Sequence, residues 1–370
     1  MAYVFILLAM VMLRLCLPRD GERERRIFAT ACCFMLVCLA ALRAPTVGRD
    51  TQLFLDVFDK LHGRSLPDVL TFPMWVEPGF RVLCWLIGLF TANGQWLIVL
   101  TSVFINVSVS DFIYRHAKNV YLGFFLYLTM MQYTLYLNVM RQALAIAIIL
   151  FAWGFFKKRR YVPYILLVLL AATFHTSALL FLLCPLLCLV PVTRRTLRVI
   201  LPLTLILALT GALLVRPILR VVTSLLPRYS GYEATSFDAL YCFLAVFLVI
   251  TGVGIWRLYF SKDAIERSTP RGSFDEVGFL TLMMLTGVVV AAMMTQFGQL
   301  QRVFYYFEML YLLWLPEAVP AAFFEERKQH IAFPVLLIAT LVFATAYFLV
   351  ILFLRSALWY DALPYRFFWQ

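Results

Sequence analysis

Long hydrophobic runs separated by short polar segments follow one another along almost the whole chain. They lack the alternation of every second residue that marks membrane β-strands, so they indicate helices that cross a bilayer. Several are shorter than the roughly 20 residues that a bilayer core requires. We identify twelve runs, at residues 2–17, 27–42, 96–114, 119–137, 140–156, 161–175, 177–192, 196–215, 237–258, 276–296, 302–322 and 331–354.

One long connection, residues 43–95, interrupts this pattern. Within it, the run 79–92 is short and contains Arg81, so we predict an interfacial or re-entrant helix inside an outer loop. We find no internal repeat and no separate soluble domain. The expected fold is an all-α polytopic membrane protein with about twelve transmembrane helices, in which residues 1–370 form a single integral membrane domain.

Basic residues predict the orientation, because cytoplasmic loops carry an excess of Lys and Arg. A thirteen-span arrangement with an inner N-terminus gives the same overall balance as twelve spans with both termini outside. Two details favour twelve: the short 18–26 loop holds four arginines, and the long 43–78 segment mixes five acidic residues with its basic ones. The inner face then receives the basic segments at 14, 18–26, 115–118, 157–160, 194–198, 257–271 and 326–328.

Composition agrees with this interpretation, since 63% of the residues are hydrophobic and 14% are charged, against about 45–50% and 25% in soluble domains. The net charge of +12 comes mostly from the short basic loops, so we expect no nucleic-acid partner. The eight cysteines lie in or beside hydrophobic runs, which predicts neither zinc nor disulfides. The first run lacks a basic n-region and a cleavage site, so we expect it to remain as a span.

Six short polar motifs fall on the outer face in this arrangement, and most lie at the ends of spans. They are GRDT (48–51), EPGF (77–80), NVMRQ (138–142), FHTS (174–177), RVFYY (302–306) and PYR (364–366). Because the motifs converge on one level of the membrane, they predict a site at that level.

NVMRQ places polar groups at the head of a very hydrophobic helix. We expect Asn138 to cap this helix, whose N-terminus then offers free N–H groups and a partial positive charge. Arg141 adds a forked cation suited to phosphate, and Gln142 follows it. Together they predict an anion site, although an interfacial arginine reaching to water is the structural alternative.

Two other motifs carry candidate residues. Arg302 opens a hydrophobic helix, and Tyr305 and Tyr306 follow three and four residues later on the same side. This group is suited to a second phosphate or a sugar, or to anchoring in the aromatic belt of the interface. His175 is a candidate base or phosphate ligand, or a packing residue in a tight helix hairpin.

Two carboxylates in the outer loop are candidate general bases, Asp50 between Arg49 and Thr51, and Glu77. The alternative is an ordinary solvated loop. Pro78 restricts the backbone directly after Glu77, and Gly79 allows another backbone to approach closely. EPGF therefore has the composition of an ordered turn that packs closely against another segment.

These motifs, in this order and spacing, resemble those of the EpsG family of bacterial membrane proteins. The likeness rests on VGRDT, EPGF, NVMRQALA, FHTSA, RVFYYF and PYR and covers nearly the whole chain. EpsG proteins are grouped with the Wzy-like polymerases that join oligosaccharide units in exopolysaccharide, capsule and O-antigen synthesis.

The resemblance implies a GT-C-like glycosyltransferase architecture in the bacterial cytoplasmic (inner) membrane. The substrate would be an undecaprenyl-diphosphate-linked oligosaccharide, used on the periplasmic or extracellular face. Arg141 and Arg302 would stabilise the departing diphosphate, and Asp50 or Glu77, ahead of His175, would accept a proton in an inverting displacement. We expect no cofactor and no metal, and flippase and chain-length regulator proteins are candidate partners.

Three other functions fit part of the sequence. A glycan flippase would share the spans and the lipid substrate, but would need charged residues along a path across the whole membrane. A membrane acyltransferase would use a histidine and arginines within spans. A purely structural subunit would not need polar motifs at so many span ends.

Overall fold

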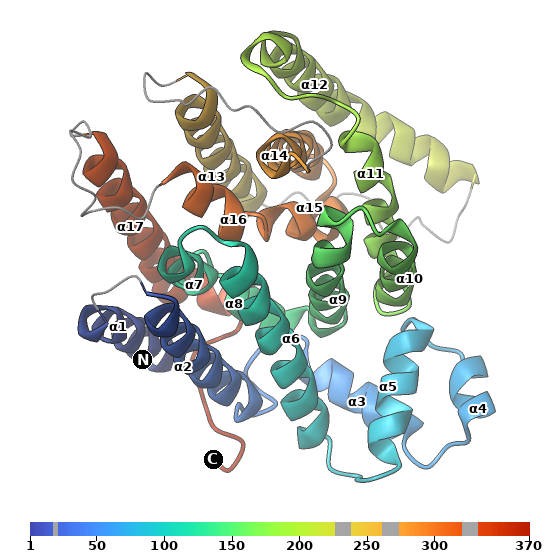
Figure 1. The fold of residues 1–370 in the computed structure, drawn as a ribbon. Coiled ribbons are helices and arrows are strands. Elements are labelled where there is room, and N and C mark those ends of the chain that lie inside the picture. The colour runs from blue at the N-terminus through green and yellow to red at the C-terminus, as the bar shows by residue number, and fades with distance from the viewer. Residues whose placement is uncertain (18–20, 226–237, 261–273, 320–331) are drawn as a thin grey trace. The chain divides into compact units, whose positions relative to one another are not determined.

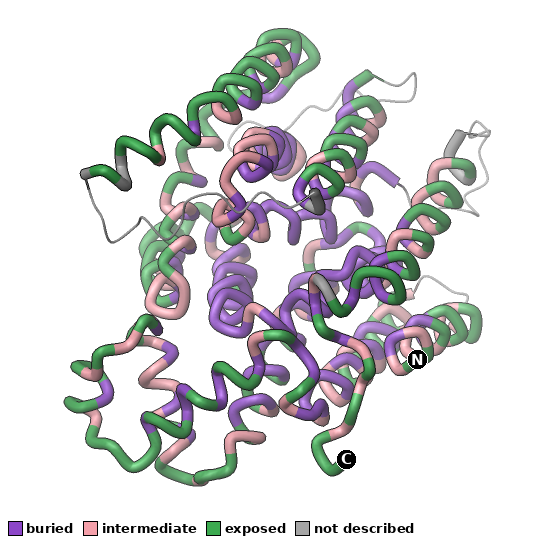
Figure 2. The backbone as a smooth tube through the Cα atoms, turned by 180° about the vertical axis from the view of Figure 1, so that it is seen from behind, coloured by how far each residue is buried: buried purple, intermediate pink, exposed green. Residues whose placement is uncertain are grey.

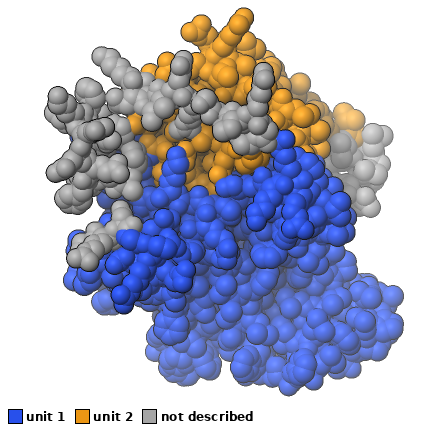
Figure 3. All heavy atoms as spheres, viewed as in Figure 1, with its two compact units in different colours: residues 1–182, 319–370 blue, residues 183–318 orange. Residues whose placement is uncertain are grey.

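The computed structural model describes residues 1–17, 21–225, 238–260, 274–319 and 332–370, and its regular structure in these ranges is helical (Figure 1). The chain forms two compact units, one of residues 1–182 and 319–370 and the other of residues 183–318, which Figure 3 colours separately. The basic segments 261–271 and 326–328 lie outside the described residues.

Unit 1 contains the first ten α-helices and the C-terminal helices. Helix α2 packs on α6 and α7, α6 packs on α9, α9 on α10, and α17 on α7. The helices are α1 (Ala2–Cys16), α2 (Glu22–Ala41), α3 (Thr51–Leu61), α4 (Leu66–Thr71), α5 (Pro78–Gly88), α6 (Gln95–His116), α7 (Val120–Thr129), α8 (Gln132–Asn138), α9 (Met140–Lys157), α10 (Tyr161–Ala172), α17 (Ala332–Val350) and α18 (Ser356–Trp359). The 3-10 helix η1 (Thr176–Leu183) extends to the boundary with unit 2, and the π-helix η5 (Ile351–Arg355) joins α17 to α18.

Unit 2 is built around α14, which packs on α12, α13 and α15. Its helices are α11 (Cys184–Leu187), α12 (Arg194–Leu225), α13 (Asp238–Ile255), η3 (Trp256–Phe260), α14 (Glu276–Met294), η4 (Gly298–Leu300), α15 (Gln301–Glu308) and α16 (Tyr311–Ala318). The Trp314 indole donates to the Ile250 carbonyl (3.1 Å), which fixes α16 on α13.

Six helices in the described ranges are long and hydrophobic enough to cross a bilayer, and the bent pair α7–α8 makes a seventh if it is one span. Burial differs sharply among them (Figure 2). In α9, 78% of the most hydrophobic window is buried, whereas the value is 17% in α12 and 22% in the span formed by α17 and η5. A helix that is hydrophobic all round but poorly covered by protein is suited to face lipid. The protein is therefore a helical multi-pass membrane protein.

The structure supports the prediction of a multi-pass helical membrane protein but not the number of twelve spans. The run 119–137 is a pair of helices bent by 52°, and the run 302–322 is divided between α15 and α16. Four more hydrophobic helices have 10–17 residues, too few to cross alone. Hydrophobicity marks membrane-embedded chain but does not reveal where a helix breaks.

The connection 43–95 is a folded region and not an open loop. Three short helices, α3, α4 and α5, lie next to one another in it (Figure 1). Ser65 caps α4 by accepting from the Asp68 amide, and Pro78 opens α5, where its missing N–H costs nothing. With 11 residues, α5 is only about 16 Å long. It is therefore too short to cross a bilayer core by itself, and its place at the interface stays a prediction.

Candidate functional site

The predicted phosphate-binding arginine and one of the predicted carboxylates meet in unit 1. Arg141 lies in the first turn of α9, Glu77 directly precedes α5, and their side chains form an ion pair. The two side chains are only 9% and 20% exposed. Loss of either partner would leave the other charge largely buried, which is costly.

Aromatic rings complete the surroundings of the Arg141 guanidinium. Its central carbon lies 4.4 Å from the ring centroid of Trp75 and 5.8 Å from that of Phe54. Phe54 packs in turn on Phe80, with 5.4 Å between the centroids. Because aromatic faces attract cations, one carboxylate and two rings hold Arg141, and all three come from the region 43–95.

The GRDT backbone docks against the end of α8. The Arg49 amide donates to Oδ1 of Asn138 (2.5 Å), and the Thr51 hydroxyl donates to the Val47 carbonyl (2.9 Å). Gly48 has a φ of +98°, and a Cβ there would lie 3.0 Å from the carbonyl oxygen of Leu137. Glycine suits both the conformation and the close approach.

The prediction that Asn138 caps the helix of Arg141 is wrong. Asn138 is the last residue of α8, and Val139 precedes α9 without a side-chain cap. While Oδ1 of Asn138 accepts from the GRDT backbone, its Nδ2 donates to the Thr134 carbonyl (2.8 Å). The Asn138 side chain therefore links the GRDT backbone to α8. It does not cap α9, because α9 begins one residue later than the pattern predicts.

EPGF docks against the residues before FHTS. The Gly79 amide donates to the Thr173 carbonyl (2.8 Å), and a Cβ on Gly79 would lie only 2.7 Å from that oxygen. This is the close backbone approach that the sequence predicts for this glycine. His175 is half-buried, and its Nδ1 lies 2.7 Å from the Ser177 hydroxyl.

The C-terminal PYR segment joins the same region of unit 1. The Ala44 amide donates to the Arg366 carbonyl (2.9 Å), and the Gly48 amide donates to the Asp361 carbonyl (3.0 Å). The Tyr365 hydroxyl donates to the Leu39 carbonyl (2.7 Å), and burial raises the pKa of Tyr365 to about 12. This tyrosine is therefore a neutral structural donor.

The remaining candidates in unit 1 differ in exposure. Arg49 is exposed, and Asp50, which precedes α3, is half-buried and makes no side-chain cap to that helix. Gln142 is 2% exposed and Asn138 is 5% exposed. Arg49 and Asp50 are thus the members of this group that solvent reaches most readily.

The RVFYY residues belong to unit 2. Arg302, in the first turn of α15, is exposed, and Tyr305 is half-buried, whereas Tyr306 is fully buried. Tyr306 therefore does not share the exposure of Arg302, since its ring belongs to the core of the unit.

Two arginines that we do not predict as site residues hold the region in place. Arg81 donates to the carbonyls of Phe72 (2.8 Å), Met74 (2.7 Å) and Val76 (2.6 Å). The buried Arg43 donates to the Ala40 carbonyl (2.6 Å) and to the Ser102 hydroxyl (2.9 Å). An arginine within a short hydrophobic segment was the available signal for Arg81.

Comparison with known proteins identifies the chain at the level of a family. No curated protein and no solved structure matches it. A family model described as the EpsG family matches residues 26–367, nearly the whole chain. The match confirms the resemblance carried by the six motifs, and the chain belongs to the EpsG family.

Proposed function

We propose that this protein is a polymerase of lipid-linked oligosaccharide units in exopolysaccharide, capsule or O-antigen synthesis. The observation that carries the proposal is the ion pair of Arg141 and Glu77, which joins two motifs of an EpsG-family chain in a largely buried setting. The enzyme would transfer a growing glycan from undecaprenyl diphosphate to the sugar end of a second lipid-linked unit. Its architecture would be GT-C-like.

The reaction needs stabilisation of a leaving diphosphate. The acceptor hydroxyl attacks the anomeric carbon of the donor, the bond from this carbon to the diphosphate oxygen breaks, and undecaprenyl diphosphate departs with the electron pair. Negative charge then develops on the diphosphate, and a pre-oriented guanidinium lowers the barrier. Arg141 is oriented by Glu77, Trp75 and Phe54 before substrate arrives.

The acceptor hydroxyl must lose its proton to a base. Asp50 and Glu77 are the proposed candidates, ahead of His175. Pairing with a guanidinium favours the charged form of a carboxylate and so makes it a weaker base, and the ion pair also commits Glu77 to holding Arg141. Asp50 is half-buried directly before α3, and the amide of its neighbour Arg49 donates to Oδ1 of Asn138. One displacement of this kind inverts the anomeric centre.

Arg302 and Tyr305 provide a second proposed contact with substrate, in unit 2. The exposed Arg302 offers a cation, and the half-buried Tyr305 offers a hydroxyl three residues later on the same helix. A phosphate or a sugar hydroxyl would suit this pair. Gln142 and Tyr306 would then act through packing, because both are buried.

The proposed location is the bacterial cytoplasmic membrane, with the reaction on its outer face. The polar motifs of unit 1 meet in one region, as a one-sided enzyme requires. Flippase and chain-length regulator proteins would supply and control the substrate.

The direct test uses purified protein and an undecaprenyl-diphosphate oligosaccharide from its own pathway, with products resolved on a gel. We expect a ladder from the wild type, and loss of the ladder in Arg141→Ala and Glu77→Gln variants that remain folded. A single extended product would replace the polymerase by a one-unit transferase. Movement of substrate across vesicle membranes without any product would identify a flippase in place of the polymerase. An acylated glycan as product would identify an acyltransferase.

A further inference from the structure

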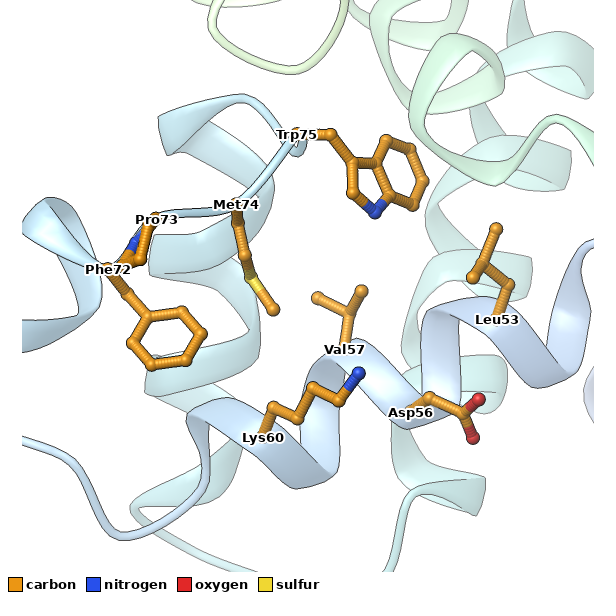
Figure 4. Close-up of a pocket in the computed structure, with 8 residues that line it drawn as sticks. All are labelled: Leu53, Asp56, Val57, Lys60, Phe72, Pro73, Met74 and Trp75. Carbon is orange, nitrogen blue, oxygen red and sulfur yellow. The ribbon is translucent and has the colours of Figure 1, made fainter.

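A pocket of about 380 Å³ opens in unit 1 beside the Arg141–Glu77 pair. It lies between α3 and residues 72–75 (Figure 4). Small-ligand sites span roughly 300–1,000 Å³, so the pocket fits one or two small rings. It is lined by Leu53, Asp56, Val57, Lys60, Phe72, Pro73, Met74 and Trp75.

One wall is a single stripe of α3. Leu53, Asp56, Val57 and Lys60 recur at helical spacing, so they share one face of the helix. Leu53 and Val57 give this wall apolar surface, while Asp56 and Lys60 add an acceptor and a donor. Figure 4 shows the Lys60 side chain running along α3 toward Val57.

The opposite wall is preformed. The Arg81 guanidinium donates to the carbonyls of Phe72, Met74 and Val76 and so fixes the backbone of residues 72–75. A wall held by several charge-assisted hydrogen bonds needs little reordering when a ligand binds.

Trp75 connects this pocket to the ion pair. The Arg141 guanidinium covers its ring at 4.4 Å, yet Trp75 is 56% exposed, so much of the indole remains open. In Figure 4 the indole nitrogen lies on the side of the ring that faces α3. The same ring therefore borders both the proposed leaving-group site and the pocket.

We propose that this pocket is a glycan subsite, in which one sugar ring of the lipid-linked unit lies on Trp75 with hydroxyls toward Asp56 and Lys60. The assignment rests on the proposed function and adds a binding site to it. An apolar platform rimmed by a few polar groups suits a sugar ring. A prenyl tail would have to desolvate Asp56 and Lys60, and a diphosphate would meet a carboxylate beside the single lysine.

The test separates the glycan from its lipid. The probe is the repeat-unit oligosaccharide released by mild acid from the cell's own lipid-linked precursor, and binding to the purified full chain is measured by saturation-transfer NMR. Leu53→Trp fills the pocket from α3. We expect it to weaken oligosaccharide binding about tenfold, equivalent to about 1.4 kcal/mol, and to raise KM for the lipid-linked substrate with little change in kcat.

Two more variants control for folding and for helix surface. Asp59→Trp places the same side chain on α3 outside the stripe and should behave as wild type. Lys60→Met removes one polar group from an exposed position and should weaken binding without lowering the unfolding temperature. Wild-type binding in both Leu53→Trp and Lys60→Met would overturn the subsite.

The outcomes also separate this inference from the polymerase itself. If oligosaccharide binding depends on Leu53 and Lys60 but the protein makes no polymer, the glycan subsite is supported and the polymerase function is contradicted. Normal polymer with wild-type KM in Leu53→Trp would remove the subsite alone. Competition by undecaprenyl phosphate for this pocket, without any by the oligosaccharide, would make it a lipid site and overturn the proposal.

Discussion

Arg141 stands at the head of a hydrophobic helix, where a charge is expensive unless it meets a partner. Glu77 supplies the opposite charge, and Trp75 and Phe54 supply aromatic surface. This environment suits a planar, delocalised guanidinium better than a compact ammonium group. The identity of the cation should therefore matter as much as its charge.

Arg141→Lys tests that point, because lysine keeps the charge but loses the two-point donor and the flat stacking surface. We expect polymer formation to fall about 10²–10³-fold, as when one stabilising donor is lost, while the amount of folded protein stays normal. The measurement is the initial rate of ladder formation at equal protein. Near-normal rates would remove Arg141 from transition-state stabilisation.

Guanidinium groups can neutralise a diphosphate without a divalent ion. We therefore expect polymer formation by the purified enzyme to persist in excess EDTA, with a rate within about twofold of the untreated enzyme. The same assay measures it. Loss of activity that Mg²⁺ or Mn²⁺ restores would contradict metal independence.

Gly79 provides a residue-level test of packing. A methyl group there would meet the Thr173 carbonyl oxygen at 2.7 Å, so the backbones must separate in Gly79→Ala. We expect unfolding in detergent to become easier by about 1–3 kcal/mol, the usual cost of overpacking. Gly154→Ala in α9 is the matched control, because its methyl meets no atom within 4 Å. Equal melting temperatures for the two variants would argue against the docking of EPGF.

At the scale of elements, the order of residues 43–95 depends on contacts between their short helices and the turns that join them. The helices α3, α4 and α5 are short, and part of their order comes from Arg81, which ties carbonyls of the preceding turn to α5. The same turn carries Trp75 and leads into Glu77. Arg81 is thus a positioning residue for the proposed site.

Arg81→Ala should loosen this turn. We expect faster chymotryptic cleavage at residues 72–75 and about tenfold or greater loss of polymer formation, since the lost charge-assisted bonds are worth about 1.5–3 kcal/mol each. Cleavage sites are identified by mass spectrometry. Arg115→Ala, which removes an exposed ion pair with Asp111, should change neither readout. Unchanged cleavage in Arg81→Ala would show that other contacts hold the turn.

The sequence predicts the helical membrane class and the candidate residues in the short polar motifs, because hydrophobic runs and isolated polar groups at their ends are local signals. It does not predict that Arg141 pairs with Glu77, since docking of distant segments decides that contact. It also misplaces the start of α9, because Asn138 is a residue type common at N-caps but here is the last residue of α8. The wall formed by residues 72–75 depends on Arg81, whose hydrogen bonds are not visible in a pattern.

Over the whole molecule, the two units divide the predicted site residues between them. Arg49, Asp50, Glu77, Asn138, Arg141, Gln142 and His175 belong to unit 1, and Arg302, Tyr305 and Tyr306 belong to unit 2. The sequence predicts that all of these residues lie at the outer face of the membrane, which is a prediction of the transmembrane topology.

Cysteine labelling in intact cells tests the topology. Asp59→Cys, in α3, should react with a membrane-impermeant maleimide, whereas Lys158→Cys, at the end of α9, should react only after permeabilisation. Both positions are exposed, so access through the membrane decides the result. The wild-type protein gives the background from native cysteines. The reverse pattern would turn the predicted orientation inside out.

The pairing of Ala44 and Gly48 with the carbonyls of Arg366 and Asp361 has a consequence for biogenesis. The backbone that presents GRDT is braced by residues that leave the ribosome some three hundred positions after it. A nascent chain can insert its early helices while this brace is still missing. Assembly of the GRDT side of the proposed site is therefore coupled to completion of synthesis, because a half-made chain lacks these backbone hydrogen bonds.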